Sequence, residues 1–234
     1  ATAAQIDAIS CKAFRIGLGP FGLMNLTGPP IALHSTDYLA EQLNTPRYNG
    51  AQNLRGLVAE NAMWPIEDDS EYTQDQYTTV SERLLGVVFG VAAQIVEEDI
   101  CSMEDVDRGA KVGLRWARGP FEMMNRIGVA EAYRMAQSYQ AIAGEAWMLP
   151  AFFKDQSGAS TNWDFSYVDS SIEDGIATIT INRPEAMNAL NEVVVAQLTE
   201  AVQAANVDSN VTTIVLDGAG KAFVAGADVK FFVD

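Results

Sequence analysis

Histidine, cysteine and lysine are scarce in this chain, and the scarcity narrows what the protein can be. The 234 residues include one histidine, His34, and two cysteines, Cys11 and Cys101, that lie far apart. Such spacing is not typical of a metal site or a redox pair, so we expect no metal and two reduced thiols in or near a core. His34 falls on a predicted helix, where we expect a solvated or hydrogen-bonded side chain rather than a base.

Positive charge is also scarce, with 15 basic against 31 acidic residues and a formal net charge of -16. The resulting field repels nucleic acid and anionic membrane surfaces, so neither is an expected partner. The longest uncharged apolar run, residues 84–96, is shorter than the roughly 20 residues of a membrane span and predicts a buried helix. No signal-peptide pattern opens the sequence, which favours a cytoplasmic protein or a fragment of one.

Several motifs of common enzyme classes are missing. No Gly-x-Gly-x-x-Gly follows a predicted strand, and the sequence has no P-loop, clustered metal ligands, or serine or cysteine nucleophile motif. With 48% hydrophobic and 20% charged residues, the composition is still that of a folded globular protein.

What the sequence does contain is an internal repeat at a separation of 100 residues. Residues 4–32 align with residues 104–132. The identical pairs are Asp7 and Asp107, Arg15 and Arg115, the Gly-Pro-Phe triplets from Gly19 and Gly119, Met24 and Met124, Asn25 and Asn125, and Gly28 and Gly128. Such a pattern indicates a duplicated structural unit.

Each copy reads as a helical hairpin: a helix, a Gly-Pro break, a short apolar turn and a second helix. The second copy follows a long apolar helix predicted over residues 80–98. The equivalent helix of the first copy would precede residue 1, so we expect the first copy to be truncated. Residues 44–75 read as the connection between the copies, with a short helix at 54–62.

A different pattern starts after the second copy. Residues 151–164 read as an interdomain linker, and residues 167–172 and 176–182 as a strand pair joined by an Asp-Gly turn. Asn188 is expected to cap an amphipathic helix to about residue 205, followed by a buried parallel strand at 213–216 and a glycine-rich turn. This is the beginning of a layered β-α domain.

Two motifs, ITINRPEAMNALN at 179–191 and KAFVAGADVKFF at 221–232, resemble the beginning of the crotonase, or enoyl-CoA hydratase, superfamily. Small residues around Gly226 allow close approach of a ligand to backbone amides. The resemblance implies that the Ala227 amide is one of two oxyanion-hole donors, whereas the simpler interpretation is a tight strand-to-helix turn. It further implies an acyl-CoA substrate contacted by Arg183, Ala186, Ala189, Ala225, Gly226, Asp228, Val229 and Lys230.

In that family the second oxyanion amide and the two glutamates that handle the water come from later segments, which this sequence lacks. A single donor supplies part of the electrostatic stabilisation and no acid-base chemistry. We therefore expect this chain alone to be inactive. Residues 165–234 should be covered by a partner or be sensitive to proteases, because a crotonase core needs further layers.

The repeated region resembles the C-terminal helical domain of 3-hydroxyacyl-CoA dehydrogenases. The tetrapeptide from Gly119 to Glu122 matches that family's Gly-Pro-Phe-Glu turn, and residues 82–85 stand in place of its Asn-Arg-Leu-Leu helix. Glu82 replaces the asparagine that contacts the reacting centre, which implies that the second copy is structural. The family's catalytic histidine and its NAD lie in a Rossmann domain, so NAD would bind outside this chain.

The predicted fold is a mainly α-helical, duplicated dehydrogenase C-terminal domain followed by a partial α/β crotonase-type domain. The expected boundaries are 1–66 for the truncated first repeat, 67–145 for the second, 146–164 for a linker and 165–234 for the crotonase part.

The predicted function is that of the central part of a bifunctional enzyme, an NAD-dependent 3-hydroxyacyl-CoA dehydrogenase and enoyl-CoA hydratase. The expected setting is fatty-acid β-oxidation or crotonyl-CoA metabolism, in a homo-oligomer completed by the Rossmann and remaining crotonase segments. Two alternatives stay open at this point. One is a non-catalytic helical module for interaction or dimerisation, and the other is an enoyl-CoA isomerase.

Overall fold

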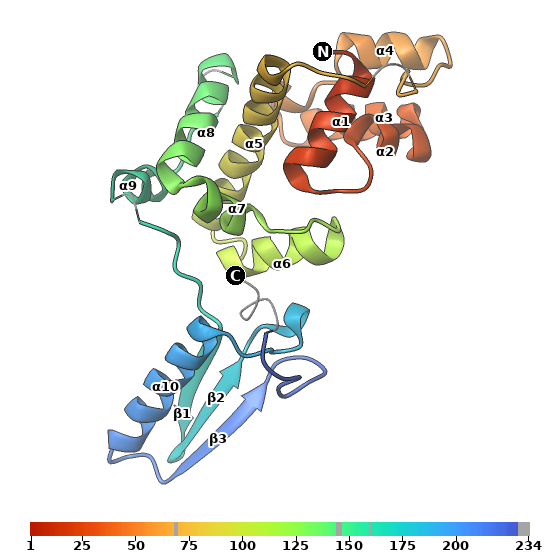
Figure 1. Ribbon diagram of the computed structural model, residues 1–234. Helices are drawn as coiled ribbons and strands as arrows, with labels where there is room; N and C mark the ends of the chain where they lie inside the picture. The colour runs from red at the N-terminus through yellow and green to blue at the C-terminus, as the bar shows by residue number, and fades with distance from the viewer. Residues whose placement is uncertain (68–69, 144–146, 160, 229–234) are drawn as a thin grey trace. The chain divides into compact units, whose positions relative to one another are not determined.

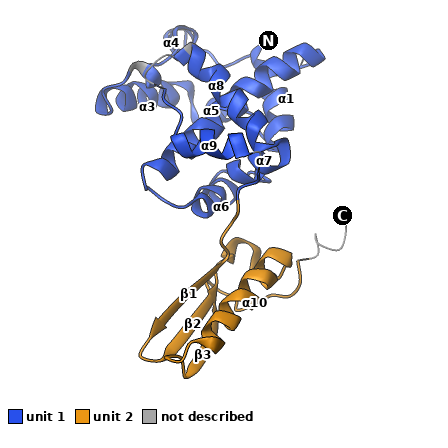
Figure 2. Cartoon of the chain, turned by 90° about the vertical axis from the view of Figure 1, so that its left-hand side faces the viewer, with its two compact units in different colours: residues 1–163 blue, residues 164–234 orange. Residues whose placement is uncertain are grey.

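The chain folds into a helical unit and a smaller α/β unit, which separate between Trp163 and Asp164 (Figures 1 and 2). The computed structural model describes residues 1–67, 70–143, 147–159 and 161–228. The helical unit contains α1 (Ala3–Phe14), α2 (Pro20–Thr27), α3 (Pro29–Gln42), η1 (Pro46–Tyr48), α4 (Gln52–Ala59), α5 (Gln74–Glu97), α6 (Met103–Gly113), α7 (Pro120–Ile127), α8 (Val129–Ala143) and α9 (Ala151–Ala159). The α/β unit contains β1 (Val168–Glu173), β2 (Ile176–Ile181), η3 (Pro184–Ala186), α10 (Glu192–Val207) and β3 (Thr213–Gly218).

The repeat is a run of four helices rather than the hairpin expected from the sequence. Helices α1 to α4 correspond in order to α6 to α9, and α5 precedes the second run. The expected apolar turn is itself a helix in both copies, α2 and α7. Pro20 and Pro120 occupy the first position of these helices, where a missing N–H costs nothing, so each proline starts a helix. The preceding helices end earlier, at Phe14 and Gly113, so the Gly-Pro pairs do not break them as the sequence predicted.

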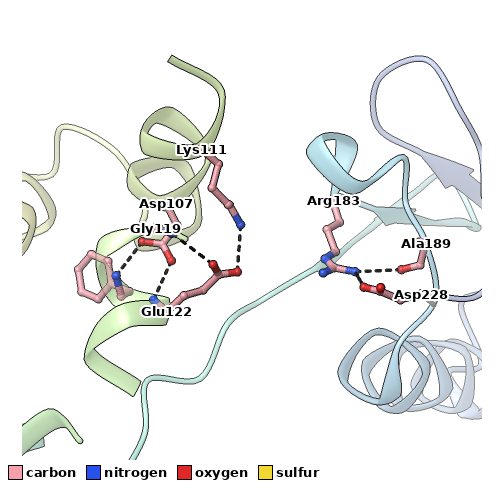
Figure 3. A network of polar contacts seen from close by, with 8 residues as sticks. Asp107, Lys111, Gly119, Glu122, Arg183, Ala189 and Asp228 are labelled. Atoms are coloured by element: carbon pink, nitrogen blue, oxygen red, sulfur yellow. Dashed lines mark hydrogen bonds and ion pairs between the residues drawn. The ribbon is translucent and has the colours of Figure 1, made fainter. Parts of the chain in front are cut away.

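A buried aspartate explains why aspartate and Gly-Pro-Phe recur together. The Asp107 carboxylate accepts hydrogen bonds from the backbone N–H groups of Phe121 (2.8 Å) and Glu122 (2.9 Å), at the first turn of α7 (Figure 3). A Cβ atom at Gly119 would overlap this carboxylate. Asp7 accepts the same two bonds, each 2.7 Å, at the start of α2. Each copy therefore caps its second helix with a side chain from its first helix.

In each copy, an asparagine side chain also forms two hydrogen bonds with the backbone of a tryptophan near the end of the copy. These bonds show that the linker expected from the sequence has the wrong bounds. The Asn125 side chain donates to the Trp163 carbonyl (3.0 Å) and accepts from the Trp163 N–H (2.7 Å), and Asn25 does the same with Trp64 (2.9 and 2.8 Å). Because α9 packs against α8 as α4 packs against α3, residues 151–163 are part of the second repeat. The expected linker over 146–164 is wrong for that stretch.

Helix α5 is the central helix of the helical unit. It packs against α8, α1, α7 and α6, and Leu85, Phe89, Ala92 and Ala93 along it are buried. Among the described residues it is the one helix long and apolar enough, by length and composition, to cross a membrane. Its contacts within the unit are those of a core helix, in agreement with the buried helix predicted from the sequence.

Burial gives Asp107 an unusual titration, which predicts a pH dependence of stability. Burial raises the pKa of Asp107 from 3.8 to about 7, against the opposing effect of the Phe121 and Glu122 backbone N–H groups. Because the folded-state pKa lies above the ordinary value, the folded protein holds more protons between these pH values. This contribution to stability is therefore complete below about pH 4 and is lost as the pH rises towards 7, by at most about 1.4 kcal/mol per pH unit.

The test compares Asp107→Asn, which does not titrate, with the unaltered chain in urea titrations from pH 5 to 8. The stability advantage of aspartate over asparagine should shrink as the pH rises. Asp7→Asn is the matched control, because Asp7 makes the same two contacts in a half-buried position. An advantage that grows with pH would mean that the two backbone N–H groups outweigh burial.

The α/β unit begins with a hairpin whose turn follows from its sequence. Strands β1 and β2 pair antiparallel around Asp174 and Gly175, which both have positive φ (48° and 77°), as a type I′ turn requires. Strand β3 pairs parallel with β2, giving the order β1-β2-β3. Helix α10 packs on the sheet, and its residues Leu198, Val202 and Ala205 meet Ala177 and Ile179 of β2.

Two sequence expectations for this unit are wrong in detail. Strand β3 is parallel as predicted but mostly exposed, because among the described residues it lies at the edge of the sheet and pairs with β2 alone. The cap of α10 is Asn191, whose side chain accepts from the Val194 N–H, rather than Asn188. The α/β unit thus matches the predicted β-α layers, and in the part of the chain that the structure describes no strand pairs with the outer side of β3.

Candidate functional site

The candidate site lies where the loop after β2 meets the loop after β3. Arg183 follows β2 and forms an ion pair with Asp228 (Nη1 to Oδ2, 2.8 Å), and it also donates to the Ala189 carbonyl (3.3 Å; Figure 3). Both charged side chains are 15% exposed, and the guanidinium lies 5.5 Å from the Tyr167 ring centre. Partial desolvation strengthens such a hydrogen-bonded pair, so it ties the two loops together.

A buried asparagine holds the same two loops from the inside. Asn188 is fully buried, and its side-chain amide donates to the carbonyls of Ala219 (2.9 Å) and Ala222 (2.7 Å). Its side-chain oxygen accepts from the Arg183 N–H at 2.8 Å. Three bonds satisfy its polar atoms in a site where an unpaired amide would be costly. Asn188 is therefore a positioning residue, a role that the sequence interpretation missed.

The backbone of residues 226–228 runs parallel to Leu190. The Leu190 N–H donates to the Gly226 carbonyl (2.9 Å), and the Asp228 N–H donates to the Leu190 carbonyl (2.8 Å). In such a bridge the residue between the two bonded groups, Ala227, turns its own N–H away from the partner strand. Among the described residues the Ala227 N–H has no acceptor, and Ala227 is exposed. An amide in this setting can donate to a ligand.

Glycine is required one residue earlier. Gly226 has φ of +139°, a conformation that side chains rarely adopt, and its ideal Cβ position has no atom within 4 Å. Backbone geometry rather than lack of space selects glycine here. Gly226 therefore sets the direction of the Ala227 N–H.

The structure brings most of the predicted site residues together. The two joined loops carry Arg183, Ala186, Ala189, Ala225, Gly226, Ala227 and Asp228. Val229 and Lys230 lie outside the described residues. Arg183 is engaged with Asp228 and Ala189 and so holds the two loops together, while the contacts of these residues with an acyl-CoA stay a prediction.

The helical unit presents a structural ion-pair network where the sequence suggested a replaced active-site residue. Glu82 on α5 pairs with Arg134 on α8 (2.9 Å), which also pairs with Glu131 (2.6 Å). Glu82 thus joins α5 and α8, two of the helices that build the second repeat. His34 is exposed on α3, and both cysteines are half-buried and free.

Two known protein families match separate stretches of the chain. Residues 80–158 match the family described as 3-hydroxyacyl-CoA dehydrogenase, C-terminal domain. Residues 171–233 match the family described as enoyl-CoA hydratase/isomerase. The first match includes α9, in agreement with its place in the second repeat.

Relatives of the chain match a limited region. A probable enoyl-CoA hydratase of Rhizobium meliloti is 51% identical over 55 residues, covering 24% of this chain and 21% of that protein. The 1,2-epoxyphenylacetyl-CoA isomerase of Escherichia coli is 38% identical over 64 residues, covering 27% and 24%. A solved structure of a probable enoyl-CoA hydratase from Mycobacterium smegmatis is 45% identical, covering 27% and 26%, with a TM-score of 0.27. The chain spans about a quarter of the length of these relatives.

Proposed function

We propose that this chain, which joins a dehydrogenase C-terminal domain to a partial hydratase/isomerase domain, is the central part of a bifunctional acyl-CoA enzyme. Its two activities would be NAD-dependent oxidation of 3-hydroxyacyl-CoA and hydration of 2-enoyl-CoA. The observation that carries the proposal is the presence of both family matches in one polypeptide. The metabolic setting we propose is fatty-acid β-oxidation or crotonyl-CoA metabolism, in the cytoplasm.

In the hydratase half, the Ala227 N–H would donate to the thioester oxygen of the acyl-CoA. Addition of water to the double bond places negative charge on that oxygen, and a fixed N–H stabilises this charge more in the transition state than in the substrate. The ion pair of Arg183 and Asp228 keeps the donor in place. The described residues of the site contribute no paired carboxylates for the water, so we propose that the chain alone is inactive.

In the dehydrogenase half, this chain would supply the supporting helices. NAD, when bound, accepts the hydride. The described residues of the helical unit form helices and connections, without the strand and glycine-rich turn that hold a dinucleotide. The nucleotide would therefore bind to another part of the proposed parent protein. The Glu82 and Arg134 pair would keep α5 and α8 together within these supporting helices.

Two other functions stay as alternatives. Similarity to a protein named as an isomerase, and a family description that names both activities, support an isomerase in place of a hydratase. A helical module for dimerisation is supported by the exposed apolar residues of the first repeat, such as Leu23 and Leu39.

The test is to determine the intact mass of the native gene product and to assay it. A product several hundred residues longer than this chain should hydrate crotonyl-CoA and should reduce NAD with 3-hydroxybutyryl-CoA. The separate 234-residue chain is the control and should show neither activity. A native product of 25.3 kDa with no affinity for acyl-CoA would contradict the proposal and favour the dimerisation module.

A further inference from the structure

The two repeats are not equally buried, although they have the same helices. Met123 on α7 is 7% exposed, whereas the equivalent Leu23 on α2 is 51% exposed. Phe14 at the end of α1 is 7% exposed, whereas the equivalent Leu114 is 60% exposed. The same holds along α3, where half-buried Ala32 corresponds to fully buried Ala132 of α8. In each pair, another element of the helical unit covers one side chain and leaves the equivalent side chain more exposed.

The partner is α5. A small cavity of about 130 Å³ lies between Phe14 of the first repeat, Met123 of the second repeat and Leu85 of α5. Leu85 is buried there, so α5 covers one residue from each repeat at this point. Helix α5 also covers α8, coming so close that a Cβ at Gly86 would overlap the Met135 backbone.

At the position related to this one by the repeat, the structure has an open apolar groove. We call it the repeat groove; it has a volume of about 690 Å³, and Leu18, Leu23, Leu84, Val88, Leu114 and Trp116 are among its lining residues. The lining segments exchange roles between the two places. Residues 13–15 with 117, 118 and 123 line the small cavity, and residues 113–115 with 17, 18 and 23 line the groove. No counterpart of Leu85 fills it among the described residues.

We infer that one further apolar helix binds in the repeat groove. This helix is related to α5 by the repeat and precedes α1 in the same polypeptide. The order of elements supports this position, because α5 immediately precedes α6, the counterpart of α1. The N-caps Thr2 and Ser102 occupy equivalent positions 100 residues apart. The helix would cover Leu23, Leu114 and α3 as α5 covers Met123, Phe14 and α8. This inference rests on the repeat and is independent of the proposed catalytic function.

The occupant can be supplied from the chain itself. A variant carries a second copy of residues 73–101 in place of Ala1, directly before Thr2, so that the copied helix reaches α1 through the same connection that joins α5 to α6. Burying several leucine and valine side chains should raise the midpoint of thermal unfolding by on the order of 10 °C. Hydrogen exchange in residues 20–27 should slow at least about tenfold.

The matched control is the same graft with the copied counterparts of Leu85 and Val88 changed to aspartate. It keeps the added length but cannot fill an apolar groove, so it should give no rise. A second pair of variants distinguishes binding of the copied helix in the repeat groove from a stabilising effect elsewhere in the protein. Leu23→Asp should change little in the ungrafted chain, where Leu23 is exposed, and should abolish the gain in the grafted chain.

Equal effects of the apolar and aspartate grafts would overturn the inference. So would an ungrafted chain that is dimeric, becomes monomeric on Leu114→Asp and gains nothing from the graft, because the groove would then hold a second copy. Tight binding of a fluorescent fatty acid that the graft does not displace would assign the groove to a lipid chain instead. None of these measurements uses acyl-CoA turnover or NAD, so their failure is distinct from failure of the proposed function.

Discussion

Replacing Ala227 by proline in the proposed bifunctional enzyme is expected to lower kcat for enoyl-CoA hydration by about 10²–10³ fold, as removal of one oxyanion donor does elsewhere. Proline lacks the N–H that points away from Leu190, and the neighbouring bonds of Gly226 and Asp228 do not involve it. KM for the enoyl-CoA should change less than kcat, because the lost bond strengthens in the transition state.

The control for this prediction is Ala227→Gly, which removes the side chain and keeps the N–H. Steady-state assays with crotonyl-CoA should give Ala227→Gly a kcat within about tenfold of the unaltered enzyme. Dehydrogenase turnover of 3-hydroxybutyryl-CoA by the same preparations reports whether the protein is folded, and both variants should retain it. Equal losses of hydratase activity in the two variants would show that packing at residue 227 matters and that its N–H does not.

The sequence predicted local features well where one short segment determines them. The Asp174-Gly175 turn follows from its own two residues, and the duplication follows from matches at one fixed separation. The division into two units between 163 and 164 lies next to residue 165, where the sequence analysis starts the α/β part. Each of these features needs no knowledge of how distant segments meet.

Features that depend on distant partners were not predicted. The Asp107 carboxylate caps a helix that begins 13 residues later, and composition alone gives no sign of that contact. The two closing tryptophans, Trp64 and Trp163, are 99 residues apart, so an alignment at a separation of 100 places them out of register. The boundary of the second repeat that the sequence predicts, residue 145, lies before α9 for this reason: no match at the fixed separation marks its closing contact.

The cap of α10 shows how a turn can move a helix start. Both Asn188 and Asn191 are suitable caps by residue type. The short helix η3 is followed by Met187 and Asn188, which both have positive φ (50° and 55°) and cannot begin an α-helix. The helix therefore starts after Asn191, which frees the Asn188 side chain to hold the site loops. The residue expected to serve the helix serves the candidate site instead.

Replacing Gly86 by alanine is expected to destabilise the helical unit by about 1–3 kcal/mol, the usual range for overpacking a core. The added Cβ would overlap the Met135 carbonyl oxygen and lie 2.8 Å from its carbonyl carbon. These are backbone atoms of α8, so no side-chain rotation relieves the clash and the two helices must separate. That cost exceeds the gain of up to about 1 kcal/mol in helix propensity that alanine brings.

Gly109→Ala in α6 is the matched control, since an ideal Cβ there has no atom within 4 Å. That change should stabilise the protein by up to about 1 kcal/mol. Thermal unfolding followed by circular dichroism at a helix-sensitive wavelength distinguishes the two, with Gly86→Ala melting lower and Gly109→Ala higher than the unaltered chain. If both variants melted higher, the close approach of α5 to α8 at Met135 would not exist in solution. The inference of a further helix in the repeat groove would then lose its basis, because that helix is inferred to approach α3 as α5 approaches α8.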